Sequence, residues 1–329
     1  MKSRVRVLRF LAGMLLASVA VAPAAAQDRY PSRPVTIVNP LPVGGGVDIA
    51  LRGLAKEMHA VLGQPVLVES RPGAGGTIAG EYVARAKPDG YVMGLLQSTQ
   101  AIPEIYAAFQ KPPYTSEDLR PVVRYMLLAF ALPSRAGAPW KDLPEFIKYV
   151  QSNPNKVRWG RTTGIGHPLH LLAYSLFKKN NLKVIEVPFK GAGDAITALL
   201  GGHIDVGFGI SVTAIQGHVQ AGKMTILALH NPRRLAVLPD TPTFKDLGFD
   251  PGVVPVYNTM FVPKGTPDEI VKKIHDAVKA AMETPALKEY AKKNVFELYY
   301  GSERDVLEEL KKDRAVSAAL VEEVAKQQK

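Results

Sequence analysis

Short runs of β-branched and aliphatic residues alternate with amphipathic helical patterns along the chain, and this alternation occurs twice. The first set begins with the strand-like residues 35–38 and continues through a glycine-rich stretch into a helical pattern over residues 48–62. The second set covers about residues 143–229. Strands that alternate with helices are typical of parallel sheets covered by helices. We therefore expect an α/β protein built from two lobes, which a length of 329 residues accommodates.

Two extended apolar stretches, residues 122–133 and 257–263, lie between or beside these sets. Two such crossings predict lobes joined by a two-stranded hinge. We expect lobe 1 to comprise residues 27–128 together with 258–300, lobe 2 to comprise residues 129–257, and a C-terminal helix to cover residues 301–329. Capping boxes at residues 266–269 and 302–305 predict where two helices near the end of the chain begin.

The first 26 residues have the pattern of a cleavable secretory signal peptide. Four basic residues among the first nine precede an apolar run at residues 10–21, and three alanines end at Ala26. A transmembrane anchor is the alternative, but the run is shorter than the roughly 20 apolar residues that a spanning helix needs. We expect export to the periplasm, cleavage near Ala26, and a protein that is not anchored in the membrane.

The composition narrows the possible chemistry. The absence of Cys excludes disulfides, thiolate metal sites, Cys nucleophiles and a lipid anchor on Cys. The net charge is +11, but the Lys and Arg residues are scattered and form no basic stripe of the kind that binds nucleic acid. No G-x-S-x-G nucleophile motif occurs. We expect no catalytic residue, no metal, no cofactor and no nucleic-acid partner.

A glycine-rich loop joins the first expected strand to the first expected helix. Its three consecutive glycines expose backbone N–H groups, and the helix that follows adds partial positive charge at its first turn. The alternative is a tight connecting turn with a plain helix cap, but a turn needs only one or two glycines. The candidate anion-binding residues of this loop are Leu41, Val43, Gly44, Gly45, Gly46 and Asp48.

A second loop of the same kind follows a strand-like run in the second set. Arg161 at its entrance either pairs with a carboxylate through two parallel hydrogen bonds or is simply solvated. His167 and His170 lack a third ligand for a metal, so we expect His170 to make a polar contact in the cleft. The candidate residues of this loop are Arg161, Thr162, Thr163, Gly164, Gly166, His167 and His170.

Further candidates lie outside these loops. Ser98, Thr99 and Gln100 follow the end of a strand-like run in lobe 1, so we expect them to reach the middle of a ligand. Lys190 opens a third glycine-bearing loop, which either lines the cleft or only turns the chain.

Taken in order, these motifs resemble the periplasmic solute receptors of tripartite tricarboxylate transporters, often called Bug proteins. Residues 40–48 carry the pattern P-x-P-x-G-G-G-x-D. The other matching segments are residues 30–34, 69–76, 88–91, 164–170, 187–191, 199–205, 221–223 and 238–243. The resemblance implies a Venus-flytrap fold of two lobes, with the carboxylate groups of a ligand held between them by loop amides and bridging waters. It also implies docking of the loaded receptor on a membrane permease.

The sequence departs from the family pattern within the candidate site. Leu41 and Val47 stand where Phe and Thr are common, and His167 stands where Ser is usual. Arg161 looks like an additional residue, and Gly209 replaces an Asp that can bind an amino group. Gly209 therefore joins the candidate set, and the lost Asp argues against an amino-acid ligand. Together with Arg161 it favours a dianion.

We therefore expect a monomeric periplasmic solute-binding protein that captures a small carboxylate, above all a dicarboxylate or aromatic dicarboxylate. Its expected partners are the permease subunits of a tripartite tricarboxylate transporter. Two alternatives remain. One is a sensor subunit that presents the same ligand to a two-component kinase. The other is a periplasmic hydrolase of an anionic ester, against which the missing nucleophile motif counts.

Overall fold

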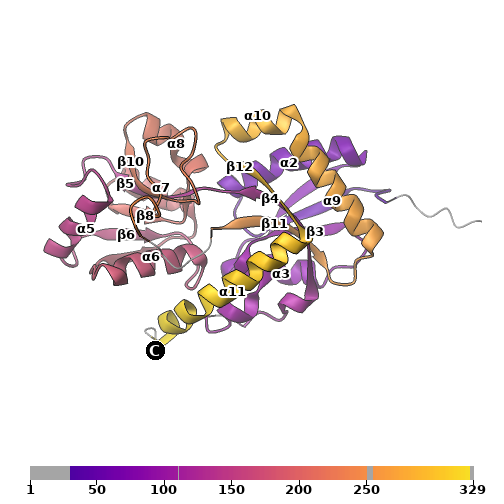
Figure 1. The fold of residues 1–329 in the computed structure, drawn as a ribbon, viewed down its shortest axis with the longest axis horizontal. Coiled ribbons are helices and arrows are strands. Elements are labelled where there is room, and N and C mark those ends of the chain that lie inside the picture. Colours follow the sequence, from indigo (N-terminus) through magenta and orange to yellow (C-terminus); the bar gives the residue numbers. More distant parts are fainter. Residues whose placement is uncertain (1–29, 110, 250–254, 327–329) are drawn as a thin grey trace, which may run out of the picture. The chain divides into compact units, whose positions relative to one another are not determined.

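The computed structural model describes residues 30–109, 111–249 and 255–326. The described helices and strands lie in the second of two units, residues 33–329. The expected signal peptide, residues 1–26, lies outside the described residues. Two sheets flanked by helices form the second unit (Figure 1).

The first sheet has the strand order β12–β4–β11–β3–β1–β2. Its strands are β1 (Val35–Asn39), β2 (Val66–Ser70), β3 (Val92–Leu96), β4 (Leu119–Leu127), β11 (Tyr257–Pro263) and β12 (Glu297–Ser302). Strand β1 pairs in parallel with β2 and β3, as the alternating pattern predicts. The other pairings are antiparallel: β11 lies between β3 and β4 and runs opposite to both, and β12 runs opposite to β4.

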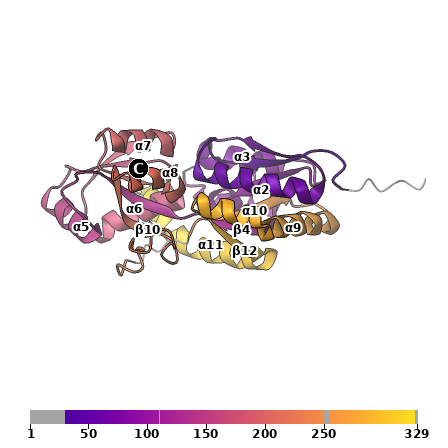
Figure 2. The same ribbon diagram turned by 90° about the horizontal axis from the view of Figure 1, so that it is seen from above.

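Helices cover the first sheet by burying amphipathic faces. They are α2 (Gly46–Leu62), α3 (Thr77–Ala84), α4 (Ser98–Ala101), α9 (Asp268–Glu283), α10 (Pro285–Lys293) and α11 (Glu303–Lys326), with the short 3-10 turns η1 (Ala74–Gly76), η2 (Pro103–Tyr106) and η3 (Ser116–Asp118). Helix α2 buries Leu51, Leu54 and Met58 and packs beside α9 (Figure 2). It ends at Gly63, whose left-handed φ of 69° suits a residue without a Cβ.

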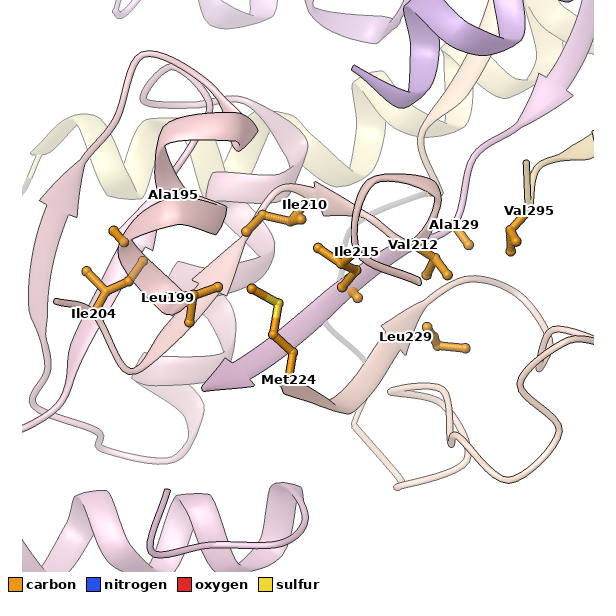
Figure 3. Close-up of a cluster of buried hydrophobic side chains, with 12 residues drawn as sticks. Ala129, Ala195, Leu199, Ile204, Ile210, Val212, Ile215, Met224, Leu229 and Val295 are labelled. Atoms are coloured by element: carbon orange, nitrogen blue, oxygen red, sulfur yellow. The ribbon is translucent and has the colours of Figure 1, made fainter. Parts of the chain in front are cut away.

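The second sheet has the strand order β10–β5–β8–β6–β7, and the short strand β9 pairs with β5. Its strands are β5 (Phe130–Arg135), β6 (Arg158–Arg161), β7 (Ile185–Pro188), β8 (Val206–Phe208), β9 (Ile210–Ser211) and β10 (Met224–His230). The helices around it are α5 (Leu143–Ser152), α6 (Pro168–Lys179), α7 (Ala192–Leu200) and α8 (Val212–Gln220). Figure 3 shows part of its core, in which Leu199, Ile215 and Met224 meet between α7, α8 and the sheet.

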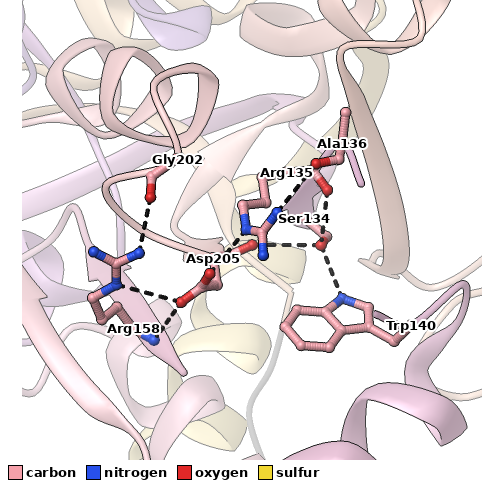
Figure 4. A network of polar contacts seen from close by, with 7 residues as sticks. All are labelled: Ser134, Arg135, Ala136, Trp140, Arg158, Gly202 and Asp205. Carbon is pink, nitrogen blue, oxygen red and sulfur yellow. Dashed lines mark hydrogen bonds and ion pairs between the residues drawn. The ribbon is translucent and has the colours of Figure 1, made fainter. Parts of the chain in front are cut away.

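A polar network fixes three strands of the second sheet to one another (Figure 4). The carboxylate of Asp205 accepts hydrogen bonds from Arg135 Nε (2.9 Å) and from the backbone N–H of Arg158 (2.8 Å). The indole of Trp140 donates to Ser134 Oγ at 2.9 Å. The segment at residues 199–205 thus ends in Asp205, whose carboxylate links β5 to β6.

The extended stretch at residues 122–133 is two strands rather than one. Strand β4 belongs to the first sheet and β5 to the second, so the chain passes between the sheets at Leu128 and Ala129. The return passage brings the chain from β10 in the second sheet to β11 in the first. Between these passages, Arg124 of β4 stacks on the rings of Tyr257 and Tyr299 and donates to the carbonyl oxygens of Tyr299 and Tyr300.

Helix α11 contacts elements around both sheets. Its first half packs on β4 and β12, and Glu309 pairs with Arg124. Its second half contacts α6, where Glu323 pairs with Lys178 and accepts a hydrogen bond from Tyr174 (2.7 Å). Between these halves the carboxylate of Asp313 is almost completely buried beside a cavity of about 20 Å³.

Three elements were not predicted, and one of the two expected capping boxes is absent. The pattern did not predict α8, α10 or β12, which have few β-branched residues or short apolar stripes. The capping box at residues 266–269 is absent: Pro267 caps α9, and the hydroxyl of Thr266 donates to Pro263 O instead. The box at residues 302–305 is confirmed, because Ser302 and Asp305 bond to each other's backbone N–H groups at 2.8 and 3.3 Å.

Candidate functional site

The glycine-rich loop between β1 and α2 is held by Asp48. Its Oδ2 accepts hydrogen bonds from the Gly44 N–H (3.0 Å) and from Arg52 Nε (2.9 Å), and its Oδ1 lies 3.4 Å from the side-chain amide of Asn39. Burial alone would raise the pKa of Asp48, but the bonds from Arg52 and Gly44 outweigh it and lower the pKa below its usual value. Asp48 is therefore an ionised group that shapes the loop from inside.

The start of α2 is the part of this loop where backbone N–H groups have no partner within the helix. The helix begins at Gly46, and the preceding residue, Gly45, supplies no side-chain cap. The first N–H groups of any helix lack partners within it and carry partial positive charge. Gly44 has a φ of 83°, a conformation that favours glycine, and Val43 beside it is 67% exposed. Gly45 is half-buried and Gly46 is buried against Ser211, so anion binding by their N–H groups stays a prediction.

The second loop, between β6 and α6, differs from expectation in its side chains. Arg161 Nε pairs with Glu186 at 2.6 Å, and Nη1 donates to Thr163 O at 2.6 Å. A two-bond grip on a ligand carboxylate would have to compete with these partners. The hydroxyl of Thr162 faces Phe208 O (2.8 Å) and Gly209 O (2.9 Å), so its hydrogen is donated within the protein and it has only lone pairs left.

The two histidines of this loop are buried and neutral. His170 Nδ1 accepts from the Gly166 N–H at 3.2 Å, and its ring packs against Trp159. His167 caps α6 by accepting from the Leu169 N–H at 3.2 Å. Burial lowers the pKa of His167 to about 3 and that of His170 to about 4. His170 therefore fixes the loop at Gly166, whose φ is 81°.

The loops of the two lobes approach each other closely. A Cβ added to Gly46 would lie 2.5 Å from Ser211 Oγ at the start of α8, and one added to Gly164 would lie 3.6 Å from Gly75 Cα. A Cβ on Gly191 would lie 3.8 Å from the Pro42 side chain. The structure thus brings together the first loop, the second loop, the Gly73–Gly76 segment and the start of α8.

The remaining candidates are placed as follows. Ser98 lines the same small cavity as Asp313 of α11, and Thr99 is buried and accepts from Gln100 Nε2 at 2.8 Å. Lys190 is exposed just before α7, whose cap residue Gly191 has no side chain. Gly209 has a φ of 77°, and a Cβ there would collide with Thr162 Oγ1.

Sequence reasoning missed two residues at this meeting of loops, Gln97 and Ser211. Gln97 follows β3 directly, and Ser211 is the last residue of β9, directly before α8. Both positions are polar residues at a strand end, which was the signal used for Ser98 and which would have found them.

Neither a metal site nor a membrane-spanning segment is evident in the part of the chain that the structure describes. No three His, Cys, Asp or Glu side chains within those residues gather closely enough to hold a metal ion. Over residues 30–109, 111–249 and 255–326, no helix combines the length and apolar character that crossing a bilayer requires.

Two α/β lobes, connected where the chain crosses twice between the sheets and carrying loops that face each other, define the class of two-lobed periplasmic binding proteins. The family model described as tripartite tricarboxylate transporter family receptor matches residues 50–325. This chain belongs to that family, which confirms the resemblance and the expected fold class. Its members are periplasmic solute-binding receptors and not enzymes, so the hydrolase alternative is set aside.

Individual relatives agree with this assignment. The chain is 34% identical over 312 residues to a Cupriavidus necator protein named "UPF0065 protein in gbd 5'region", with 91% of each chain covered. It is similar to the structure of MatC from Rhodopseudomonas palustris with bound malate: TM-score 0.79, 27% identity, 89% of this chain and 100% of that chain. It is also similar to an R. palustris protein with adipate: TM-score 0.78, 25% identity, 90% of this chain and 97% of that chain.

Proposed function

We propose that this receptor captures a small carboxylate, above all a dicarboxylate or aromatic dicarboxylate, in the periplasm and delivers it to the permease of a tripartite tricarboxylate transporter. The observation that carries the proposal is the uncapped start of α2 at Gly45 and Gly46, opposite the loops of the second sheet. The malate and adipate in the two related structures support the same class of ligand. Residues 1–26 would be removed on export.

Each end of such a ligand would meet one lobe, with the lobe boundaries given above. One carboxylate would accept hydrogen bonds from the N–H groups at the start of α2, with Leu41 and Val43 at the rim. The other would meet the backbone of Thr163 and Gly164 in the second loop. Lys190 would contribute positive potential, whereas the charge of Arg161 is offset by Glu186. Closing the lobes would remove water and strengthen these bonds.

The environment of Gly209 supports a ligand without an amino group. Thr162 Oγ1 occupies the space that a Cβ at position 209 would need, so an acidic side chain there would require the loop to move. The hydroxyl is also committed to the carbonyl oxygens of Phe208 and Gly209. With no carboxylate at this position, a ligand ammonium group would find no ion-pair partner there.

The test is a thermal-shift screen of residues 27–329, unfolded and refolded to remove carried-over ligand. The panel holds linear dicarboxylates, citrate, aromatic mono- and dicarboxylates, acidic amino acids and neutral sugars. A compound at 100 times its Kd should add about 2.7 kcal/mol of stability. We expect shifts from dicarboxylates and none from acidic amino acids. A shift from neutral sugars alone would contradict the proposal.

A further inference from the structure

Three buried polar side chains connect the second loop to the hinge. His167 Nε2 lies 3.4 Å from Gln97 Oε1, and Gln97 Nε2 donates to Asn258 Oδ1 at 3.0 Å. The three residues are 5%, 4% and 0% exposed. His167 comes from the second lobe, Gln97 from the end of β3, and Asn258 from β11, the strand through which the chain returns to the first sheet.

The direction of these hydrogen bonds is set by their neighbours. His167 Nδ1 accepts from the Leu169 N–H, so in the neutral ring the hydrogen is on Nε2 and points to Gln97. Burial keeps the pKa of His167 at about 3, so the ring is neutral at ordinary pH. Gln97 then accepts with its oxygen and donates with its nitrogen, and all the bonds run from the second loop toward the hinge.

The same corner also holds the first-lobe segment that faces the second loop. The Gln97 N–H donates to Gln100 Oε1 at 2.9 Å, and Gln100 Nε2 donates to Gly75 O at 2.7 Å. Gly75 is the residue that approaches Gly164. Gln97 therefore connects the hinge strand, through Asn258, with the facing loops, through Gln100 and Gly75.

We propose that His167, Gln97 and Asn258 form a latch between the lobes that favours their closed arrangement. The inference rests on the proposed function only in that closure is how a receptor of this kind would retain its ligand. In the latch His167 is a positioning residue: its two ring nitrogens are used by Leu169 and Gln97, so neither is left for a ligand. The bond to Gln97 is long, so its loss should change the open-to-closed ratio modestly, roughly three- to tenfold.

A measurement without any ligand tests the latch. Because the chain has no Cys, spin labels can be placed through Lys56→Cys on α2 and Lys148→Cys on α5, both exposed positions in different lobes. His167→Asn keeps an acceptor for the Leu169 N–H but is too short to reach Gln97. His203→Asn, at an exposed site, is the matched control. We expect pulsed dipolar spectroscopy to show a larger long-distance population in His167→Asn than in the parent and the control. Superimposable distance distributions would overturn the latch.

A double-mutant cycle separates a latch from direct ligand contact. With adipate and malate as probes, His167→Asn should raise the dissociation rate roughly three- to tenfold and leave the association rate unchanged, because the latch exists only after closure. Gln97→Leu should do the same, and the double variant should be no worse than either single one. Additive losses would refute the latch. If neither probe binds the parent, neither is the ligand, and the ligand-free distances still decide the latch.

Discussion

Acid should destabilise this protein through two buried histidines, His167 and His170. Burial lowers their pKa values to about 3 and about 4, whereas an unfolded chain binds a proton on each ring below about pH 6.5. Between these limits the unfolded state holds more protons than the folded one, so the free energy of unfolding falls as the pH falls. Each histidine contributes about 1.4 kcal/mol per pH unit, or about 2.7 kcal/mol for the pair.

The variant His167→Asn isolates one of these contributions while keeping the helix cap. Its stability should fall less steeply than that of the parent, by about 1.4 kcal/mol per pH unit between pH 6 and pH 4.5. Urea unfolding at a series of pH values measures this difference, and His203→Asn, at an exposed site, serves as the control. Parallel stability curves for parent and His167→Asn would refute the claim that His167 is buried and neutral.

Three further substitutions test the packing described above. Gly209→Ala should lower the free energy of unfolding by about 1–3 kcal/mol, because the residue has a positive φ and a Cβ there meets Thr162. Gly217→Ala, in helix α8 with open space around it, should leave the free energy of unfolding unchanged or raise it by about 0.5–1 kcal/mol. Urea denaturation measures both. Arg124→Lys should cost about 2–3 kcal/mol in the same assay, since Lys cannot donate to two carbonyl oxygens while stacked on two rings. Burial raises the pKa of Asp313, so the parent loses stability as the pH rises above the pKa of an unfolded Asp, about 3.9. The stability of Asp313→Asn relative to the parent should therefore increase with pH above about pH 4 in the same assay, and an unchanged difference would contradict this.

The sequence predicted what depends on local pattern. The first loop was recognisable because three glycines between a strand and a helix have few structural uses, and the structure has the helix start at Gly46 without a side-chain cap. The two α/β sets and the crossing at residues 257–263 were likewise readable from β-branched runs. Strand β12 was not predicted, because its register is set by β4, a partner more than 160 residues away in the chain.

Side-chain roles in the second loop could not be predicted, because they depend on residues distant in sequence. Nothing near Arg161 indicates that Glu186, on the neighbouring strand β7, pairs with it. The hydroxyl of Thr162 donates to the carbonyl oxygens of Phe208 and Gly209 because β6 pairs in parallel with β8. The position of Gln97 at a strand end is readable, but its contacts are not, because its partners His167 and Asn258 lie in the other lobe and in the returning strand.

The central claim is that a carboxylate is held by the backbone N–H groups at the start of α2. The most direct test is calorimetric titration of ligand-stripped residues 27–329 with adipate and malate, each compared with its neutral diamide. The account predicts binding of a dicarboxylate, weakened by added salt, and no binding of the diamides, because only the anion is favoured by the helix start. Equal affinity for an acid and its diamide, or binding of neutral compounds only, would contradict it.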